Sequence, residues 1–160
     1  MGGDGRLHAP KLPRALILAT GEEVPQGQSI RARLVIVEVR AGEVDRTRLS
    51  ECQCTGREGQ LAESMGAFVR WIASQYEEVQ GRLQNRVLEI RSQGCGRTVH
   101  ARLPSALAEL QTGWETFLQF AQEVGAIGLA EKAELEQRSV KALARLATMH
   151  RWATIRHYAL

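Results

Sequence analysis

Two arginines and one threonine near the start of the chain are of types that act on phosphate groups. Arg31 and Arg33 adjoin the apolar run RLVIVEV, and Thr20 ends the earlier apolar run LILAT. A guanidinium is permanently charged and can donate two parallel hydrogen bonds to phosphate oxygens. A threonine at the carboxyl end of a strand lies where α/β folds hold ligand-contacting hydroxyls. The alternative interpretation is a pair of exposed loop arginines and an ordinary Thr-Gly turn.

Strands would be needed to position these side chains. Residues 15–20 and 33–39 are almost continuously apolar and contain β-branched residues, a pattern typical of strands buried on both faces of a parallel sheet. We therefore expect two adjacent, parallel strands. Because two strands alone are marginal in water, the pattern indicates that neighbouring strands are supplied from elsewhere.

The remainder of the chain has the periodicity of helices. A stripe of apolar residues predicts one long helix, a second helix is expected from near Pro104 to Gly125, and a third from near Leu129 toward the C-terminus. The short loops between them predict antiparallel neighbours in a bundle. The stripe of the first helix consists of Leu61, Met65, Phe68, Ile72, Tyr76, Val79, Leu83, Val87 and Ile90.

These patterns together predict an α/β fragment: two parallel strands followed by a three- to four-helix antiparallel bundle. Residues 1–13, rich in Gly and Pro, are expected to be a flexible lead-in, residues 14–42 to hold the strands, and residues 43–160 to be helical. A length of 160 residues suits one domain with a core of its own.

Composition sets limits on the class of protein. The net charge of +3 and the pI near 9.0 permit contact with nucleic acid without arguing for it. No apolar run approaches the ~20 residues of a membrane span, and the first residues lack the features of a signal peptide, so we expect a cytoplasmic protein without a membrane partner. The best candidates for a phosphate-contacting face are the arginines near the predicted helix break, Arg82, Arg86, Arg97 and Arg102.

Two kinds of site are disfavoured by the spacing of the residues that would form them. Cys52, Cys54, Cys95 and His100 could supply four zinc ligands, but residues two apart on a helix face different directions, so no metal site is expected. No phosphate-binding loop of the form G-x-x-x-x-G-K-[ST] occurs, so the chain alone should not hydrolyse ATP.

Several stretches of the chain resemble the C-terminal part of the domain of unknown function 927 proteins. These stretches are PRALILATGEEVPQGQSIRARLVIVEV with the GEVD that follows it, GAFVRWIASQYEEV, and GWETFLQFAQEVGAI. The family consists of primase-helicase-type P-loop ATPases of phages, plasmids and other mobile elements. The resemblance runs from about Pro13 to about Leu146, and its first stretch is the most specific.

The resemblance implies the sensor and arginine-finger portion of a DNA-dependent ATPase. Thr20 would sense the γ-phosphate, and Arg31 or Arg33 would reach a neighbouring subunit's nucleotide, a contact worth about 10³ to 10⁵ in rate. Residues 14–42 would then be the edge of a P-loop sheet. ATP and Mg²⁺ would bind only if another segment or chain supplied the missing phosphate-binding and magnesium-binding motifs, and the partners would be DNA and a homo-oligomeric ring or a complementary ATPase chain.

The alternative hypothesis is a stand-alone helical module that binds DNA or another protein. In that case the helices would be the working part, and the two apolar runs would only brace them.

Overall fold

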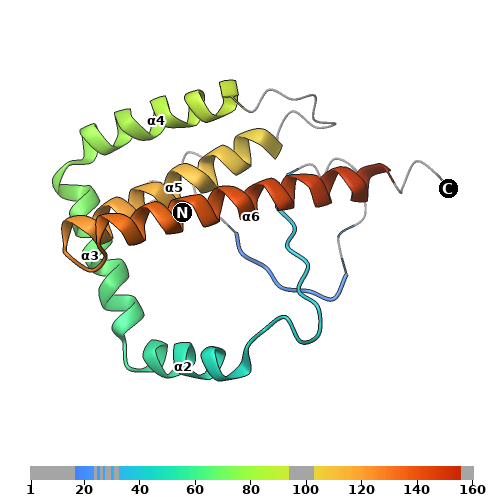
Figure 1. Cartoon of the computed structure of the whole chain (residues 1–160), viewed down its shortest axis with the longest axis horizontal. Coiled ribbons are helices and arrows are strands. Elements are labelled where there is room, and N and C mark those ends of the chain that lie inside the picture. The colour runs from blue at the N-terminus through green and yellow to red at the C-terminus, as the bar shows by residue number, and fades with distance from the viewer. Residues whose placement is uncertain are drawn as a thin grey trace, which may run out of the picture.

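The computed structural model describes residues 17–155 apart from residues 24, 26, 28–29, 31–32 and 94–102, with side chains up to residue 149. The predicted lead-in, residues 1–13, lies outside this part. Figure 1 shows the helices of the described part. They are α2 (Arg46–Arg57), α3 (Gln60–Ser74), α4 (Tyr76–Gln93), α5 (Leu103–Glu123) and α6 (Leu129–Ile155).

The described residues contain no strand, so the predicted α/β fold with two parallel strands is wrong. Residues 34–40 have no regular secondary structure. Ile17 and Leu18 are 87% and 92% exposed, and Val37 and Val39 are 65% and 64% exposed. A strand is stabilised by hydrogen bonds to neighbouring strands and by side chains that cover its faces. The described part offers no second strand, and in the later run only Val35 and Ile36 are half-buried.

The predicted long helix is in fact two helices. Gln75 has φ −139° and ψ 38°, and it separates α3 from α4. The sequence Ser74-Gln75-Tyr76 contains no glycine or proline, so no local signal marks the break. Figure 1 shows that α3 runs in a different direction from α4.

An aromatic cluster joins the end of α3 to α5. Phe68 lies edge-on to Phe117, with ring centroids 5.3 Å apart, and 5.4 Å from Phe120. Trp71 lies 5.9 Å from Phe120. Aromatic pairs at such separations contribute beyond their buried area. The bend at Gln75 allows α3 to make these contacts while α4 packs along α5.

Helix α5 ends as the sequence predicts, at Gly125. This glycine has φ 75°, in the left-handed region, and its N–H donates to the carbonyl of Gln122 at 3.1 Å. The N–H of Ala126 donates to the carbonyl of Ala121 at 2.8 Å. The two hydrogen bonds form a Schellman motif, which turns the chain back so that α6 runs antiparallel to α5.

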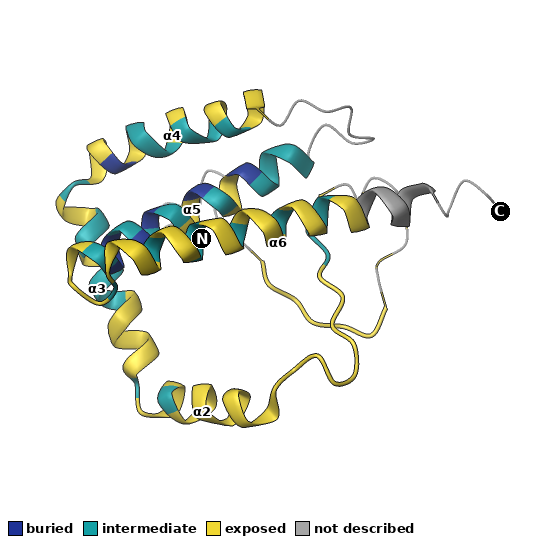
Figure 2. Ribbon diagram, in the orientation of Figure 1, coloured by how far each residue is buried: buried dark blue, intermediate teal, exposed yellow. Residues whose placement is uncertain are grey.

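Helices α4, α5 and α6 form one antiparallel layer with α5 in the middle. Residues of α5 contact both α4 and α6, whereas α4 and α6 make no contact with each other among the described residues. The predicted antiparallel packing of neighbouring helices is present, with α4 and α6 each packed on α5. Figure 2 shows the buried positions concentrated on α5, with one on α4. They are Val79, Ala108, Thr112, Thr116, Leu118, Phe120 and Ala121.

The two buried threonines of α5 are satisfied within their own helix. Thr112 Oγ1 donates to the carbonyl of Ala108 at 2.7 Å, and Thr116 Oγ1 donates to the carbonyl of Thr112 at 2.8 Å. Since buried hydroxyls without partners are costly, these hydrogen bonds make polar side chains tolerable in the core.

Helix α2 stands apart from the three-helix layer. Among the described helices it contacts only α3, and it has no buried residue. Asp45 caps it by accepting hydrogen bonds from two backbone N–H groups of its first turn. Figure 1 shows α2 and the start of α3 projecting away from the layer. We call residues 46–69 the arm.

Candidate functional site

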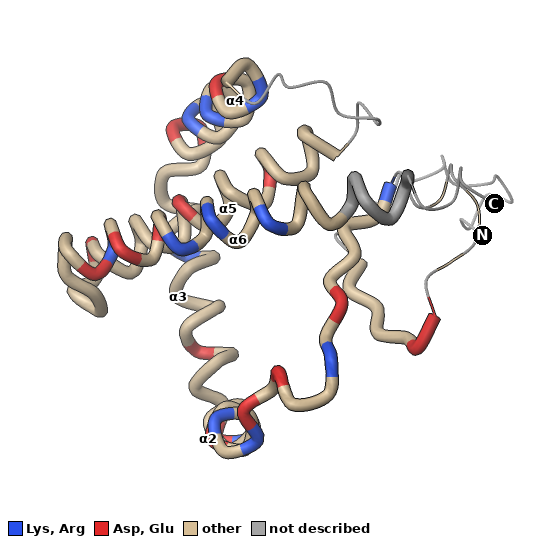
Figure 3. Tube along the Cα trace, turned by 45° about the vertical axis from the view of Figure 1, so that its right-hand side comes forward, with Lys and Arg blue, Asp and Glu red and all other residues tan. Residues whose placement is uncertain are grey.

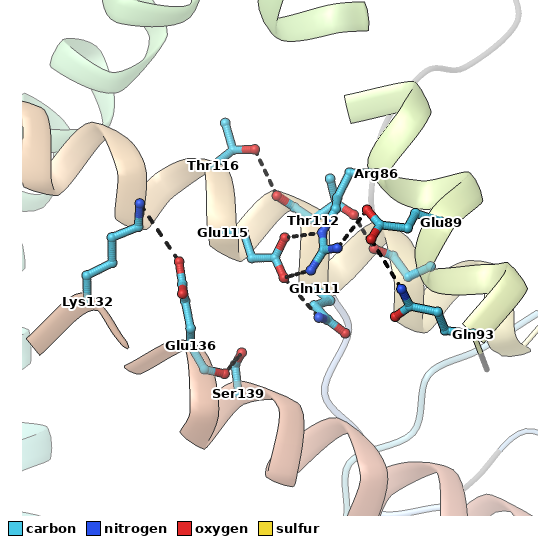
Figure 4. A network of polar contacts seen from close by, with 11 residues as sticks. Arg86, Glu89, Gln93, Gln111, Thr112, Glu115, Thr116, Lys132, Glu136 and Ser139 are labelled. Atoms are coloured by element: carbon cyan, nitrogen blue, oxygen red, sulfur yellow. Dashed lines mark hydrogen bonds and ion pairs between the residues drawn. The ribbon is translucent and has the colours of Figure 1, made fainter. Parts of the chain in front are cut away.

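Arg86 is held between two glutamates at the contact of α4 with α5. Its Nε donates to Glu115 Oε2 at 2.8 Å and its Nη2 donates to Glu115 Oε1 at 2.9 Å, a bidentate pair. Its Nη1 donates to Glu89 Oε2 at 2.8 Å. Gln111 and Gln93 donate to the same two carboxylates (Figure 4). The N–H groups on both hydrogen-bonding edges of the guanidinium are therefore paired with carboxylates of the protein.

The charges of this cluster stabilise one another. The hydrogen bonds from Arg86 lower the pKa of Glu115, although partial burial opposes the shift. The hydrogen bonds to Glu115 and then to Glu89 raise the pKa of Arg86. Both groups are thus fully ionised near neutral pH, and the pair ties α4 to α5.

Arg82, one turn earlier on α4, lies against the indole of Trp71. Its guanidinium carbon is 6.0 Å from the ring centroid, which is within cation–π range. Its Nη1 lies 3.9 Å from Glu78, and its Nη2 is buried without a hydrogen-bond partner. The Trp71 Nε1–H donates to Glu123 at 2.7 Å. Hydrogen bonds from Gln119 and then from Trp71 lower the pKa of Glu123.

The four arginines predicted to contact nucleic acid are only partly placed by the structure. Arg82 and Arg86 lie on α4 and are both engaged with other side chains of the protein. Arg97 and Arg102 lie outside the described residues. Binding of a phosphate by Arg86 would have to displace Glu115. The assignment of these four residues to nucleic acid stays a prediction.

The residues predicted to act as sensor and finger lie in the N-terminal segment. Thr20 and Arg33 are both exposed, and the N–H of Arg33 donates to the carbonyl of Ile30 at 2.9 Å. Arg31 lies outside the described residues. The sheet edge that was expected to aim these side chains is absent from the described part. Their catalytic assignment, and with it the need for ATP and Mg²⁺, stays a prediction.

No group of three or more potential ligands capable of holding a metal ion occurs within the described residues. Cys52 and Cys54 are exposed free thiols on α2, and Cys54 Sγ donates to Glu58 at 3.5 Å. Cys95 and His100 lie outside the described residues. In the part of the chain that the structure describes, no helix is long and apolar enough to cross a membrane.

A row of exposed apolar side chains runs along the arm. Leu61, Met65 and Val69 follow one another at four-residue intervals on α3 and are 57%, 55% and 56% exposed. Gly56 of α2 is close to Leu61, so the row continues toward α2, where Leu49 is 45% exposed. The sequence shows Leu61 and Met65 as part of one apolar stripe, but it does not reveal that this end of the stripe lacks a covering helix.

No protein-family model matches the chain, and no similar protein was found among curated proteins or solved structures. The resemblance to the domain of unknown function 927 family therefore stays a prediction, and the function has to be argued from the surfaces of the helices.

Proposed function

We propose that the chain is a helical protein-interaction module that self-associates through the arm. The observation that carries this proposal is the incomplete cover of the apolar stripe on α3. The stripe packs on α5 through Phe68, while Leu61 and Met65 before it, and Val69 beside it, are more than half exposed. Association would bury these side chains.

The free energy available from such burial is substantial. Burying a large aliphatic side chain that was exposed contributes about 1.5–3 kcal/mol. Contiguous apolar patches on monomers are limited in size, and larger ones mark interaction sites. The three exposed side chains on α3, with Leu49 exposed on α2, are the residues that such an interaction site would use.

A second copy of the chain is a partner that covers two of the exposed apolar surfaces in one association. Besides the arm, each copy leaves Val37 and Val39 of the N-terminal segment more than half exposed. A symmetric dimer brings the same two surfaces from both copies to one interface, so a single association could cover both. The small core of the α4–α5–α6 layer gives further support, since a second layer would bury more of its apolar surface.

Self-association is tested by the molar mass of the purified chain in solution, measured by light scattering after size exclusion at micromolar concentration. We expect a dimer for the natural chain and a monomer for the double variant Leu61→Gln, Met65→Gln, with unchanged helical circular dichroism. The matched control is Leu88→Gln, which changes an equally exposed apolar residue on α4, and it should leave the dimer intact. A monomeric natural chain, or a double variant that still dimerises, would refute the proposal.

A further inference from the structure

We infer that the outer face of α6 binds the phosphate backbone of a nucleic acid through Arg138, Lys141 and Arg145. These residues follow one another at intervals of three and four, so they share one face of the helix. All three are exposed. None of them takes part in the ion pairs found among the described residues. Figure 3 shows basic positions recurring along α6.

The opposite face of α6 is the one that packs on α5, so the basic face is free to meet a ligand. The half-buried residues of α6 lie on the other side of the helix: Lys132, Leu135, Glu136, Ser139, Leu143, Leu146 and Ala147. Ala142 lies between the cations on their own face, and its small side chain leaves the guanidinium groups accessible.

Nothing within α6 itself accounts for the positions of these three cations. The helix dipole favours positive charge within the last turn, but Arg138 and Lys141 lie well inside a helix that ends at Ile155. Glu134 stands one turn before Arg138, in a position for an ion pair, yet the pair is not formed. Glu131 and Glu134 occupy the N-terminal part of the same face, so its positive charge is concentrated from Arg138 onward.

The spread of the cations fits a polymer better than a single anion. From Arg138 to Arg145 the helix rises about 10 Å, and a nucleic-acid strand carries a phosphate about every 3.4 Å of its axis. Three cations thus span about three phosphates. An anionic membrane fits less well, because a helix that inserts into one needs large apolar side chains beside its cations. Leu135, Leu143 and Leu146 are half-buried on the other side of α6, and Met149, 46% exposed, is the one large apolar side chain on the basic face within the described residues.

The experiment measures binding of the full chain to a mixed-sequence oligonucleotide, double-stranded and single-stranded, by fluorescence anisotropy over a range of salt concentrations. Three phosphate contacts predict a slope of log affinity against log salt of about −2 to −3, or about a 40-fold loss between about 50 and about 200 mM salt for a duplex. The triple variant Arg138→Gln, Lys141→Gln, Arg145→Gln should lose this salt-dependent binding.

Helix α2 provides the matched control, because it carries three exposed arginines that do not share one face. The variant Arg46→Gln, Arg48→Gln, Arg57→Gln removes the same positive charge and should keep most of the affinity. Equal losses in the two variants would show a net-charge effect and overturn the inference. Binding to phosphatidylserine vesicles or inorganic phosphate without binding to the oligonucleotide would overturn it as well. Helix α6 lies outside the arm, whereas the control variant lies within it, so the molar mass of both variants is measured by light scattering to separate nucleic-acid binding from self-association.

Discussion

The bidentate pair between Arg86 and Glu115 is the principal polar tie between α4 and α5, with N–O distances of 2.8 and 2.9 Å. Removal of the carboxylate in Glu115→Ala should lower the free energy of unfolding by about 1–2 kcal/mol. This value lies between those of exposed and fully buried pairs, because the two side chains are 34% and 21% exposed. Urea unfolding followed by circular dichroism measures the change. Glu89→Ala, which removes the more exposed partner, should lower the free energy of unfolding by a smaller amount. A larger loss in Glu89→Ala than in Glu115→Ala would contradict this prediction.

The same pair predicts a loss of stability in acid. The pKa of Glu115 is lowered in the folded chain from its ordinary value of 4.5. A carboxyl group with a lowered pKa contributes stability above its unfolded pKa, and this contribution is lost as the pH falls through the folded pKa. The free energy of unfolding should therefore fall below about pH 4.5, as measured by urea unfolding at successive pH values. In Glu115→Gln the fall should be shallower, and an unchanged fall would assign the effect to other carboxyl groups.

The core of the layer is small, so single truncations within it should be severe. Leu118 is 2% exposed, and Leu118→Ala should cost about 3 kcal/mol through lost burial and a cavity. Leu88, which is 61% exposed on α4, provides the matched control. Leu88→Ala should change the free energy of unfolding by less than about 0.5 kcal/mol. If the two variants have equal stabilities, the packing of α5 described above is incorrect.

Two glycines of the same helix region should respond to alanine in opposite ways. Gly125 has φ 75° in the Schellman motif, where an L side chain is strained, and Gly125→Ala should cost about 1 kcal/mol. Gly113 lies inside α5 with open space where a Cβ would stand, so Gly113→Ala should raise the stability by about 0.5–1 kcal/mol. The melting temperatures of the two variants are measured by thermal unfolding. Shifts of both in the same direction would contradict this prediction.

The absence of a phosphate-binding loop predicts that the chain by itself does not hydrolyse ATP. We expect no release of phosphate from MgATP above the buffer rate, with or without DNA. Turnover that disappears in Arg33→Ala would contradict this expectation and would support the assignment of Arg33 as an arginine finger. The measurement requires only the purified chain and a phosphate-release assay.

The helices were predictable where local signals decide them. Pro104 and Gly125 mark the ends of α5 to within a residue or two, and the start of α6 at Leu129 follows from the apolar periodicity. The break at Gln75 was not predictable, because the apolar stripe continues across it. The chain bends there so that Phe68 and Trp71 can meet α5, and such contacts between distant segments leave no mark on the local sequence.

The N-terminal segment shows the opposite error, a local pattern without the partners it needs. The run RLVIVEV has the composition of a buried strand, yet Val37 and Val39 are mostly exposed, since composition alone supplies no neighbouring strand.

The role of Arg86 was equally unpredictable from the sequence. It meets Glu115, a residue of another helix, and charge spacing on α4 alone could suggest only an exposed cation.

The place of α5 in the layer has a consequence for communication across the molecule. Because α4 and α6 make no contact among the described residues, α5 is the described element that links the surroundings of Arg86 to the basic face of α6. The Schellman motif at Gly125 fixes the connection between the end of α5 and the start of α6. Any displacement of α5 would therefore change the packing of both outer helices at once, because each of them packs on α5.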